Sequence, residues 1–326
     1  MSRRALSWCA LSWRRVPAKG VGAALLLAAG ALSAGGVHAD SSIYKYRDAS
    51  GNLVYSEQKP ESAKTETINI TLESKTPRID VEQVADGEHL ELRAVNECRC
   101  AAEFEVRLLD ARNLKLPANA VYHVVLSPQS EQAIVQATHE GNGAPGWRYS
   151  WKGVLGTPGA QHRPHEPYRA PFAIGSSFRI TQAYPMRFTH DTLDSLYAVD
   201  IALPDETPVY AAREGMVINL RHDSFRGAAT AVMLDQANMI EILHDDGTIG
   251  MYAHLHWDSV RVQPGQYVHR GEYIADSGAT GFTTGAHLHF AVLRNAGLQA
   301  EAVPIQFTGP GGTAITPQTD MMLTAY

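Results

Sequence analysis

Short stretches that alternate apolar and polar residues recur along most of this chain, and turn residues separate them. Examples lie at residues 90–95, 103–108 and 120–126. Further on, the pair Asp246-Gly247 stands between the runs 239–244 and 248–253, which is a strong β-hairpin signal. A period of two is typical of strands, and no stretch has the pattern of a long helix. The sequence therefore predicts a mainly β protein with antiparallel strands.

The chain divides into segments of different character. Residues 156–171 are rich in proline and contain few apolar residues, so they cannot form a central strand or a helix interior. The evenly spaced stretches before this region are typical of a small β-sandwich. The predicted segments are a signal peptide (1–39), a short β-hairpin module (40–62), a β-sandwich-like accessory domain (64–158), a linker (159–171), an antiparallel β domain (172–307) and a C-terminal tail (308–326).

The first forty residues have the layout of a secretory signal peptide. They begin with five basic and no acidic residues, continue with the apolar run 21–37 and end in a small-x-small pattern at 37–39. A membrane anchor is the alternative, but the apolar run is short and contains Gly30, Gly35 and Gly36. We expect an exported protein that stays tethered to the membrane if its signal is not cleaved.

Removal of this signal would make the chain strongly acidic. The full chain has 28 basic and 34 acidic residues, so loss of five basic residues leaves 23 against 34, a net charge of −11. A chain this acidic lacks the excess of basic residues that binds the phosphates of nucleic acid. We therefore expect no nucleic-acid partner.

Cys98 and Cys100 are the two cysteines that would remain after cleavage. On one strand their side chains share a face, but a bridge across a single residue would be strained. An oxidising compartment favours a local disulfide. The sequence leaves both a disulfide and a free thiol pair open.

Residues 43–47 and 53–56 alternate around a loop that contains Gly51, which predicts a β-hairpin. This segment resembles a short module of unknown function that follows the signal peptide in many secreted proteobacterial proteins. The resemblance is confined to this segment and implies an exported protein in the periplasm of a Gram-negative bacterium.

The run His287-Leu288-His289-Phe290 carries the first chemical signal. In a strand, Leu288 and Phe290 would point into the core while His287 and His289 share the opposite face. Two imidazoles on one face can serve a metal ion and its water together. Alone the pattern is weak evidence, because paired histidines on strands are often simply exposed polar residues.

Two further runs supply candidates for the same cleft. Asp200 lies on the polar face of the run 197–202 between two alanines, which leaves open space above its carboxylate. An ordinary solvent-facing aspartate is the alternative. In the run 248–256, alternation places His254 on the same side as Tyr252, for which packing is an equally good explanation.

Together, the order and spacing of these runs resemble the lysostaphin-type metallopeptidase family. The resemblance covers roughly residues 175–307. It is carried by the blocks 198–202, 207–215, 252–255, 264–268 and 278–290. It implies that 172–307 is a lysostaphin-type metallopeptidase domain.

The family binds one Zn²⁺ ion through a His, an Asp and the second His of the H-x-H pair. By resemblance, Asp200 and His289 take two of these positions. In many members the first His lies four residues before the Asp, but here that position is Leu196. The resemblance therefore assigns the first position to His190, as in members with a longer insert. Three protein ligands leave a fourth position open, which is typical of catalytic zinc.

His254 and His287 match the two active-site histidines of the family that do not bind the metal. The resemblance implies that they orient and deprotonate a water molecule and stabilise the developing oxyanion. Histidine titrates in the range that such proton transfer needs. The sequence does not divide the two roles between them.

The resemblance implies a zinc-dependent endopeptidase that hydrolyses stem-peptide cross-links of peptidoglycan in the cell envelope. The inferred envelope favours a bond such as D-alanyl–diaminopimelate, but the sequence does not choose it over a polyglycine bridge or a protein substrate. The alternative is a non-catalytic envelope protein that binds and activates cell-wall amidases. Relatives of that kind usually lack ligand residues, whereas all five site residues are present here.

Overall fold

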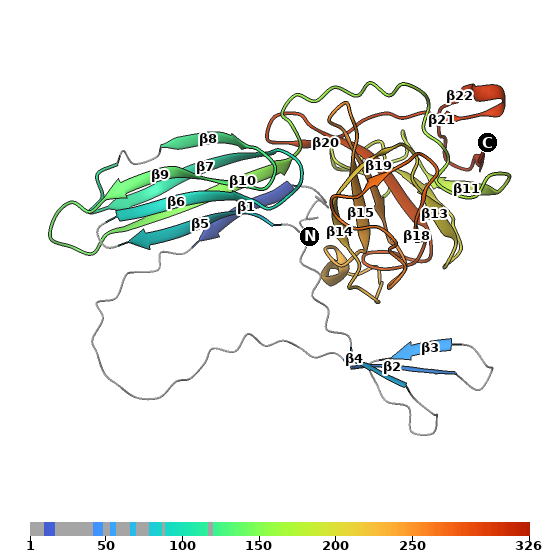
Figure 1. Cartoon of the computed structure of the whole chain (residues 1–326), viewed down its shortest axis with the longest axis horizontal. Coiled ribbons are helices and arrows are strands. Elements are labelled where there is room, and N and C mark those ends of the chain that lie inside the picture. The colour runs from blue at the N-terminus through green and yellow to red at the C-terminus, as the bar shows by residue number, and fades with distance from the viewer. Residues whose placement is uncertain are drawn as a thin grey trace. The chain divides into compact units, whose positions relative to one another are not determined.

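The computed structural model describes residues 10–16, 42–47, 53–56, 66–69, 78–86, 89–116 and 120–326. Their strands pair antiparallel, and apart from two short 3-10 turns, η1 (Ala231–Met233) and η2 (Pro310–Gly312), these residues contain no helix. The predicted mainly β class is therefore confirmed (Figure 1). Among the described residues, no helix is long and apolar enough to span a membrane.

The chain forms two compact units, of which the smaller comprises residues 22–74. In this unit β2 (Ser42–Arg47) pairs with β3 (Leu53–Ser56), as the alternation predicts, and also with β4 (Glu66–Asn69). The module is therefore a three-stranded sheet that extends past residue 62, where the sequence placed its end. The loop 48–52 lies outside the described residues.

In the larger unit, two sheets form the sandwich predicted for 64–158. One sheet has the order β1 (Ala10–Val16), β10 (Gly146–Leu155), β7 (Ala102–Arg112) and β8 (Val121–Leu126). The other has the order β5 (Ile79–Asp86), β6 (His89–Asn96) and β9 (Ser130–Thr138). Alternate residues of these strands, such as Leu92, Phe104 and Trp151, meet in one apolar core. Apart from β1, the predicted signal peptide lies outside the described residues.

The second half of the larger unit is built on a nine-stranded sheet. Its order is β17 (Tyr267–Val268), β14 (Gly215–Arg221), β15 (Met239–Leu243), β16 (Ile249–Ala253), β19 (Leu288–Asn295), β12 (Val199–Ile201), β11 (Ser177–Gln182) and β23 (Met322–Thr324), with β20 (Ala300–Ala302) also paired to β19. Two small sheets join β13 (Pro208–Tyr210) to β18 (Tyr273–Asp276) and β21 (Phe307–Thr308) to β22 (Ala314–Ile315).

Apolar side chains cover both faces of the large sheet. One face carries the main core, which includes Ile201, Tyr252 and Phe290. The other face carries a smaller cluster around Met251 and Ala291. Central strands such as β16 are consequently buried at every position, so their sequence alternates only weakly between apolar and polar residues.

Two segments predicted to lie outside this domain pack into it. The segment 159–171 was expected to be a linker, yet Tyr168 is fully buried and its backbone N–H donates to the carbonyl of Gln306. The stretch 308–326 was expected to be a tail, yet β23 forms an edge of the large sheet and Leu323 lies in the core. Both segments therefore complete the domain, since each buries apolar residues against it, such as Tyr168 and Ala170 in the first and Leu323 and Ala325 in the second.

The sandwich contacts β19 at the end opposite the H-x-H pair. Leu298, in the turn after β19, donates its N–H to Oε2 of buried Glu103 at 2.7 Å, and Asn295 donates to the carbonyl of Gly156 at 3.1 Å. The two ends of a strand of this length lie roughly 20 Å apart. These contacts with the sandwich therefore lie at the end of β19 opposite His289.

Cys98 and Cys100 lie at the same interface as free, buried thiols. Their sulfur atoms are 2.9 Å apart, and both pack against Ile218 and Ile249. The hydrogen bond to Cys98 and burial together raise the pKa of the Cys100 thiol. The pair thus lies in the contact between the sandwich and the sheet, away from the histidines.

Candidate metal centre

Asp200 and His289 lie opposite each other on the paired strands β12 and β19. Because residues in register share a face, both side chains emerge together, and Oδ1 of Asp200 lies 2.9 Å from Nδ1 of His289. Their strand neighbours Val199, Ile201 and Phe290 point to the opposite face and fill the core. The pairing of two core strands therefore fixes these two polar groups.

His190 reaches the same point from the loop that joins β11 to β12. Its Nε2 atom lies 3.2 Å from Oδ2 of Asp200, and its ring stands nearly perpendicular to that of His289 with 5.0 Å between centroids. One ligand-type atom from each of the three residues lies within 4.8 Å of the others. The structure thus brings together the three residues that the sequence assigned to the metal.

The chemistry of this group fits a divalent zinc ion. All three residues are buried, and Nδ1 of His190 has no hydrogen-bond partner among the described residues. Burial alone would raise the pKa of Asp200, but hydrogen bonds to His190 and His289 outweigh it and hold the pKa well below its usual value. Two imidazoles and one ionised carboxylate form a donor set that zinc prefers, with a fourth position left for solvent or substrate.

His254 and His287 lie beside this group with their rings 4.5 Å apart. The Nδ1 atom of His254 is 2.7 Å from the carbonyl oxygen of Thr280, and that of His287 is 2.9 Å from the carbonyl oxygen of Gly285. A carbonyl can only accept, so each ring must donate from Nδ1. The Nδ1 atom of each ring is thus the donor to the loop, and Nε2 faces the cleft side; Nε2 of His287 lies 3.9 Å from Oδ1 of Asp200.

The environment keeps His254 neutral. Burial and the neighbouring charges of His287 and His289 lower the pKa of His254 to about 3. With its proton on Nδ1, this neutral ring presents Nε2 as a hydrogen-bond acceptor. His287 is more exposed than His254 and also lines the cleft.

The route by which His254 reaches the cleft differs from the predicted one. Alternation placed it on the side of Tyr252, but Tyr252 points into the main core, where its hydroxyl accepts the backbone N–H of Ala212 at 2.7 Å. The strand β16 ends at Ala253, and His254 has a φ of +63°, in the left-handed region. This backbone turn reverses the alternation, sending His254 into the cleft and Leu255 into the core.

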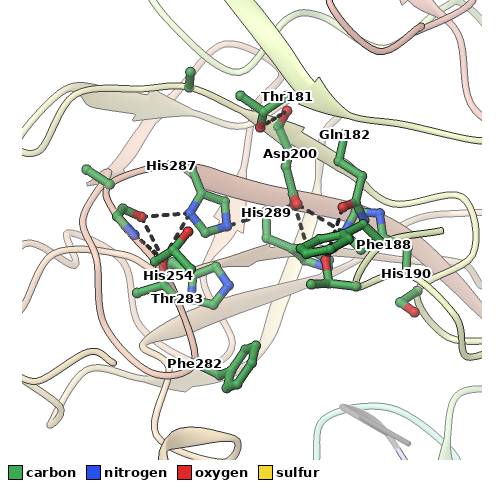
Figure 2. Close-up of a pocket in the computed structure, with 16 residues that line it drawn as sticks. Thr181, Gln182, Phe188, His190, Asp200, His254, Phe282, Thr283, His287 and His289 are labelled. Carbon is green, nitrogen blue, oxygen red and sulfur yellow. Dashed lines mark hydrogen bonds and ion pairs between the residues drawn. The ribbon is translucent and has the colours of Figure 1, made fainter. Parts of the chain in front are cut away.

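The five residues line one cleft of about 320 Å³ (Figure 2). His254 and His287 lie on one side of Asp200 and His190 on the other, as Figure 2 shows. Polar uncharged residues, three small residues and two phenylalanines form the rest of the wall. These residues are Thr181, Gln182, Phe188, Thr189, Ser195, Ala202, Phe282, Thr283, Thr284, Gly285 and Ala286.

Several supporting residues were not identified from the sequence. Asn238 is fully buried, and its backbone N–H donates to the hydroxyl of Thr280, whose carbonyl oxygen contacts His254. Thr283 places its hydroxyl 3.2 Å from Nδ1 of His287. Both threonines lie in the glycine-rich block 278–290, which gave the only sequence signal for them, whereas Asn238 had none.

The chain matches the model of peptidase family M23 over residues 195–301 and that of a domain of unknown function, DUF4124, over residues 23–79. His190 lies just before the M23 match, so its place in the site rests on the geometry. Peptidases of family M23 use zinc, and the group of His190, Asp200 and His289 can hold one ion.

Curated relatives match the same part of the chain. The peptidoglycan DD-endopeptidase ShyA of Vibrio cholerae is 31% identical over 125 residues, which cover 37% of this chain and 26% of that protein. Lysostaphin of Staphylococcus simulans is 29% identical over 127 residues, which cover 37% of this chain and 24% of that protein. The chain thus matches about a quarter of the length of these two relatives.

Among solved structures, lysostaphin from Staphylococcus simulans is 28% identical, with a TM-score of 0.27 over 36% of this chain and 43% of that one. The family match and the relatives agree with the order of the sequence blocks. The chain therefore contains a DUF4124 module and a peptidase family M23 domain.

Proposed function

We propose that this protein is a zinc-dependent endopeptidase that hydrolyses peptide cross-links of peptidoglycan in the cell envelope. The observation that carries the proposal is the convergence of three buried ligand-type side chains with two further histidines in one open cleft. Homologues with this domain are named as peptidoglycan endopeptidases, which supports the substrate class.

Each residue group has a distinct task in this mechanism. Zinc, when bound by His190, Asp200 and His289, supplies a Lewis acid that polarises the scissile carbonyl and lowers the pKa of water to about 7. His254 and His287 lie beside this group, and the Nε2 atom of each ring can accept a proton when the ring is neutral. After taking a proton, an imidazolium can stabilise the oxyanion or protonate the leaving amine.

Carbonyl contacts hold both histidines ready for this task. Because Nδ1 of each ring donates to a loop carbonyl, the ring cannot rotate without losing that hydrogen bond. The glycine-rich loop therefore sets the tautomer and orientation of both rings. Its backbone carbonyls at Thr280 and Gly285 do so without placing a second carboxylate in the cleft.

The alternative is a non-catalytic protein that activates cell-wall amidases. That reading predicts the loss of one or more site residues, whereas His190, Asp200, His254, His287 and His289 are all present and converge. For localisation we propose export to the periplasm of a Gram-negative bacterium, supported by the basic start, the apolar run 21–37 and the small-x-small pattern at 37–39.

The test uses the purified protein, zinc and a muropeptide dimer joined by a D-alanyl–diaminopimelate bond. Mass spectrometry should detect monomers that disappear with a chelator and with His287→Ala. If zinc-loaded protein yields no monomers but increases stem-peptide release by a purified amidase, the regulator alternative replaces the proposal.

A further inference from the structure

Phe188 is an exposed aromatic residue inside the cleft. It is 83% exposed, yet it lines the same cleft as His190 and Asp200 (Figure 2). Tyr184 and Met186, on the same loop, are also partly exposed. Of these three side chains only Phe188 lines the cleft, and exposed apolar groups on one surface are a common sign of a binding site.

The backbone on both sides of Phe188 is held by hydrogen bonds. Thr189 and Gln182 bond to each other through their side chains, with 3.0 Å between Nε2 of Gln182 and Oγ1 of Thr189. Met186 donates its N–H to the carbonyl of Ala183. The segment that carries the Phe188 ring is therefore fixed by hydrogen bonds, so less conformational entropy of the protein is lost when a ligand binds.

The described residues that line the cleft include no lysine, arginine or glutamate, and Asp200 is committed to the metal group. Such a wall offers no ion pair to a charged substrate group. Threonine, serine and glutamine can form hydrogen bonds with a peptide backbone. Because the backbone is common to all peptides, these bonds do not distinguish one substrate side chain from another. Phe188 and Phe282 are the two phenylalanines of this wall, and Phe188 is the more exposed of the two. Apolar contact with Phe188 can therefore distinguish one substrate side chain from another.

We propose that Phe188 determines specificity by packing against the aliphatic side chain of a residue next to the scissile bond. On this basis, which rests on the proposed function, the substrate is a cross-link whose residues carry side chains, such as D-alanyl–diaminopimelate, and not a glycine bridge. Glycine has no side chain to cover the ring. Burial of two or three methylene groups corresponds to a preference of about 10- to 100-fold.

The test compares kcat/KM for the D-alanyl–diaminopimelate dimer and for a pentaglycine-bridged peptide. In Phe188→Ala, kcat/KM for the dimer should fall about 10- to 100-fold because KM rises. Phe188→Leu should retain most of the wild-type kcat/KM. Ile174→Ala is the matched control, because Ile174 is 71% exposed but lies outside the cleft. Equal loss on both substrates, no loss on either, or a wild type that prefers pentaglycine overturns the inference.

A binding measurement separates this inference from the proposed function. Calorimetry with His287→Ala and with His287→Ala/Phe188→Ala, each zinc-loaded, measures affinity for the dimer without turnover. If the wild type cleaves neither substrate, the proposed function fails, and a dimer affinity that depends on Phe188 still supports the binding role. Equal affinity of the two variants overturns it.

Discussion

Asp200 and His289 lie directly opposite each other on β12 and β19, with Oδ1 and Nδ1 2.9 Å apart. Both strands are central in a sheet that is covered on both faces. Two of the three proposed metal ligands are therefore fixed by the core itself, whereas His190 depends on a loop. The positions of Asp200 and His289 therefore depend on strand pairing, and the position of His190 depends on the conformation of its loop.

Tyr252 provides a test of whether a residue near the site acts structurally. Its hydroxyl is the partner of the buried N–H of Ala212. Tyr252→Phe leaves that N–H unsatisfied, so the free energy of unfolding should fall by about 1–3 kcal/mol while kcat/KM changes less than about twofold. Urea denaturation and muropeptide turnover check this. A large loss of turnover in a variant of normal stability would give Tyr252 a part in the chemistry.

Asn238 joins the loop at Ser224 to Leu255, the residue that follows His254. Its Oδ1 accepts the N–H of Ser224 at 2.9 Å, and its Nδ2 donates to the carbonyl of Ser224 at 2.6 Å and to that of Leu255 at 3.3 Å. Asn238→Ala leaves several buried groups without partners, so we expect the unfolding free energy to fall by about 2–4 kcal/mol.

The same substitution should also reduce turnover, because the side chain of Asn238 donates to the carbonyl of Leu255, the residue that follows His254. Asn142→Ala, at an exposed position, is the matched control and should leave both quantities unchanged. Denaturation curves that are the same for Asn238→Ala and the wild type would show that these hydrogen bonds of Asn238 do not stabilise the fold.

His244 makes the fold sensitive to acid. It is buried, its Nδ1 donates to the carbonyl of Glu214, and burial lowers its pKa to about 4. The unfolded chain, with a histidine pKa of about 6.5, takes up this proton first as the pH falls. The unfolding free energy should therefore fall by about 2.5 kcal/mol between pH 7.5 and pH 4.5, with little further loss from this group below pH 4.

Denaturation of the wild type and of His244→Gln across this pH range measures that contribution. Glutamine can still donate to the carbonyl of Glu214 but does not titrate, so the variant should lose less stability on acidification. Parallel pH profiles for the two proteins would exclude His244 as a source of the acid sensitivity.

The sequence predicted the elements whose residues carry a local signal. Asp246-Gly247 forms the turn between β15 and β16, with Gly247 at a φ of +80° that glycine adopts readily. Period-two alternation correctly placed Asp200 and His289 on faces opposite their apolar neighbours. These inferences succeeded because strand geometry links neighbouring residues directly.

Other features depend on contacts that no local pattern records. Tyr252 was assigned to the wrong face because β16 is buried on both sides, so polarity does not distinguish its faces. The left-handed φ of His254 occurs at a non-glycine residue, so the sequence did not predict it. Asn238 gains its role from loops that are remote in sequence, and the last strand, β23, is short enough to read as a tail.

The most direct test of the account is zinc content measured alongside turnover in the same preparations. The wild type, His254→Gln and His287→Ala should each hold about one zinc ion per chain, but only the wild type should cleave the dimer at full rate. His190→Ala should lose both zinc and turnover. Stoichiometric zinc and normal cleavage in His190→Ala would contradict the three-ligand site on which the account rests.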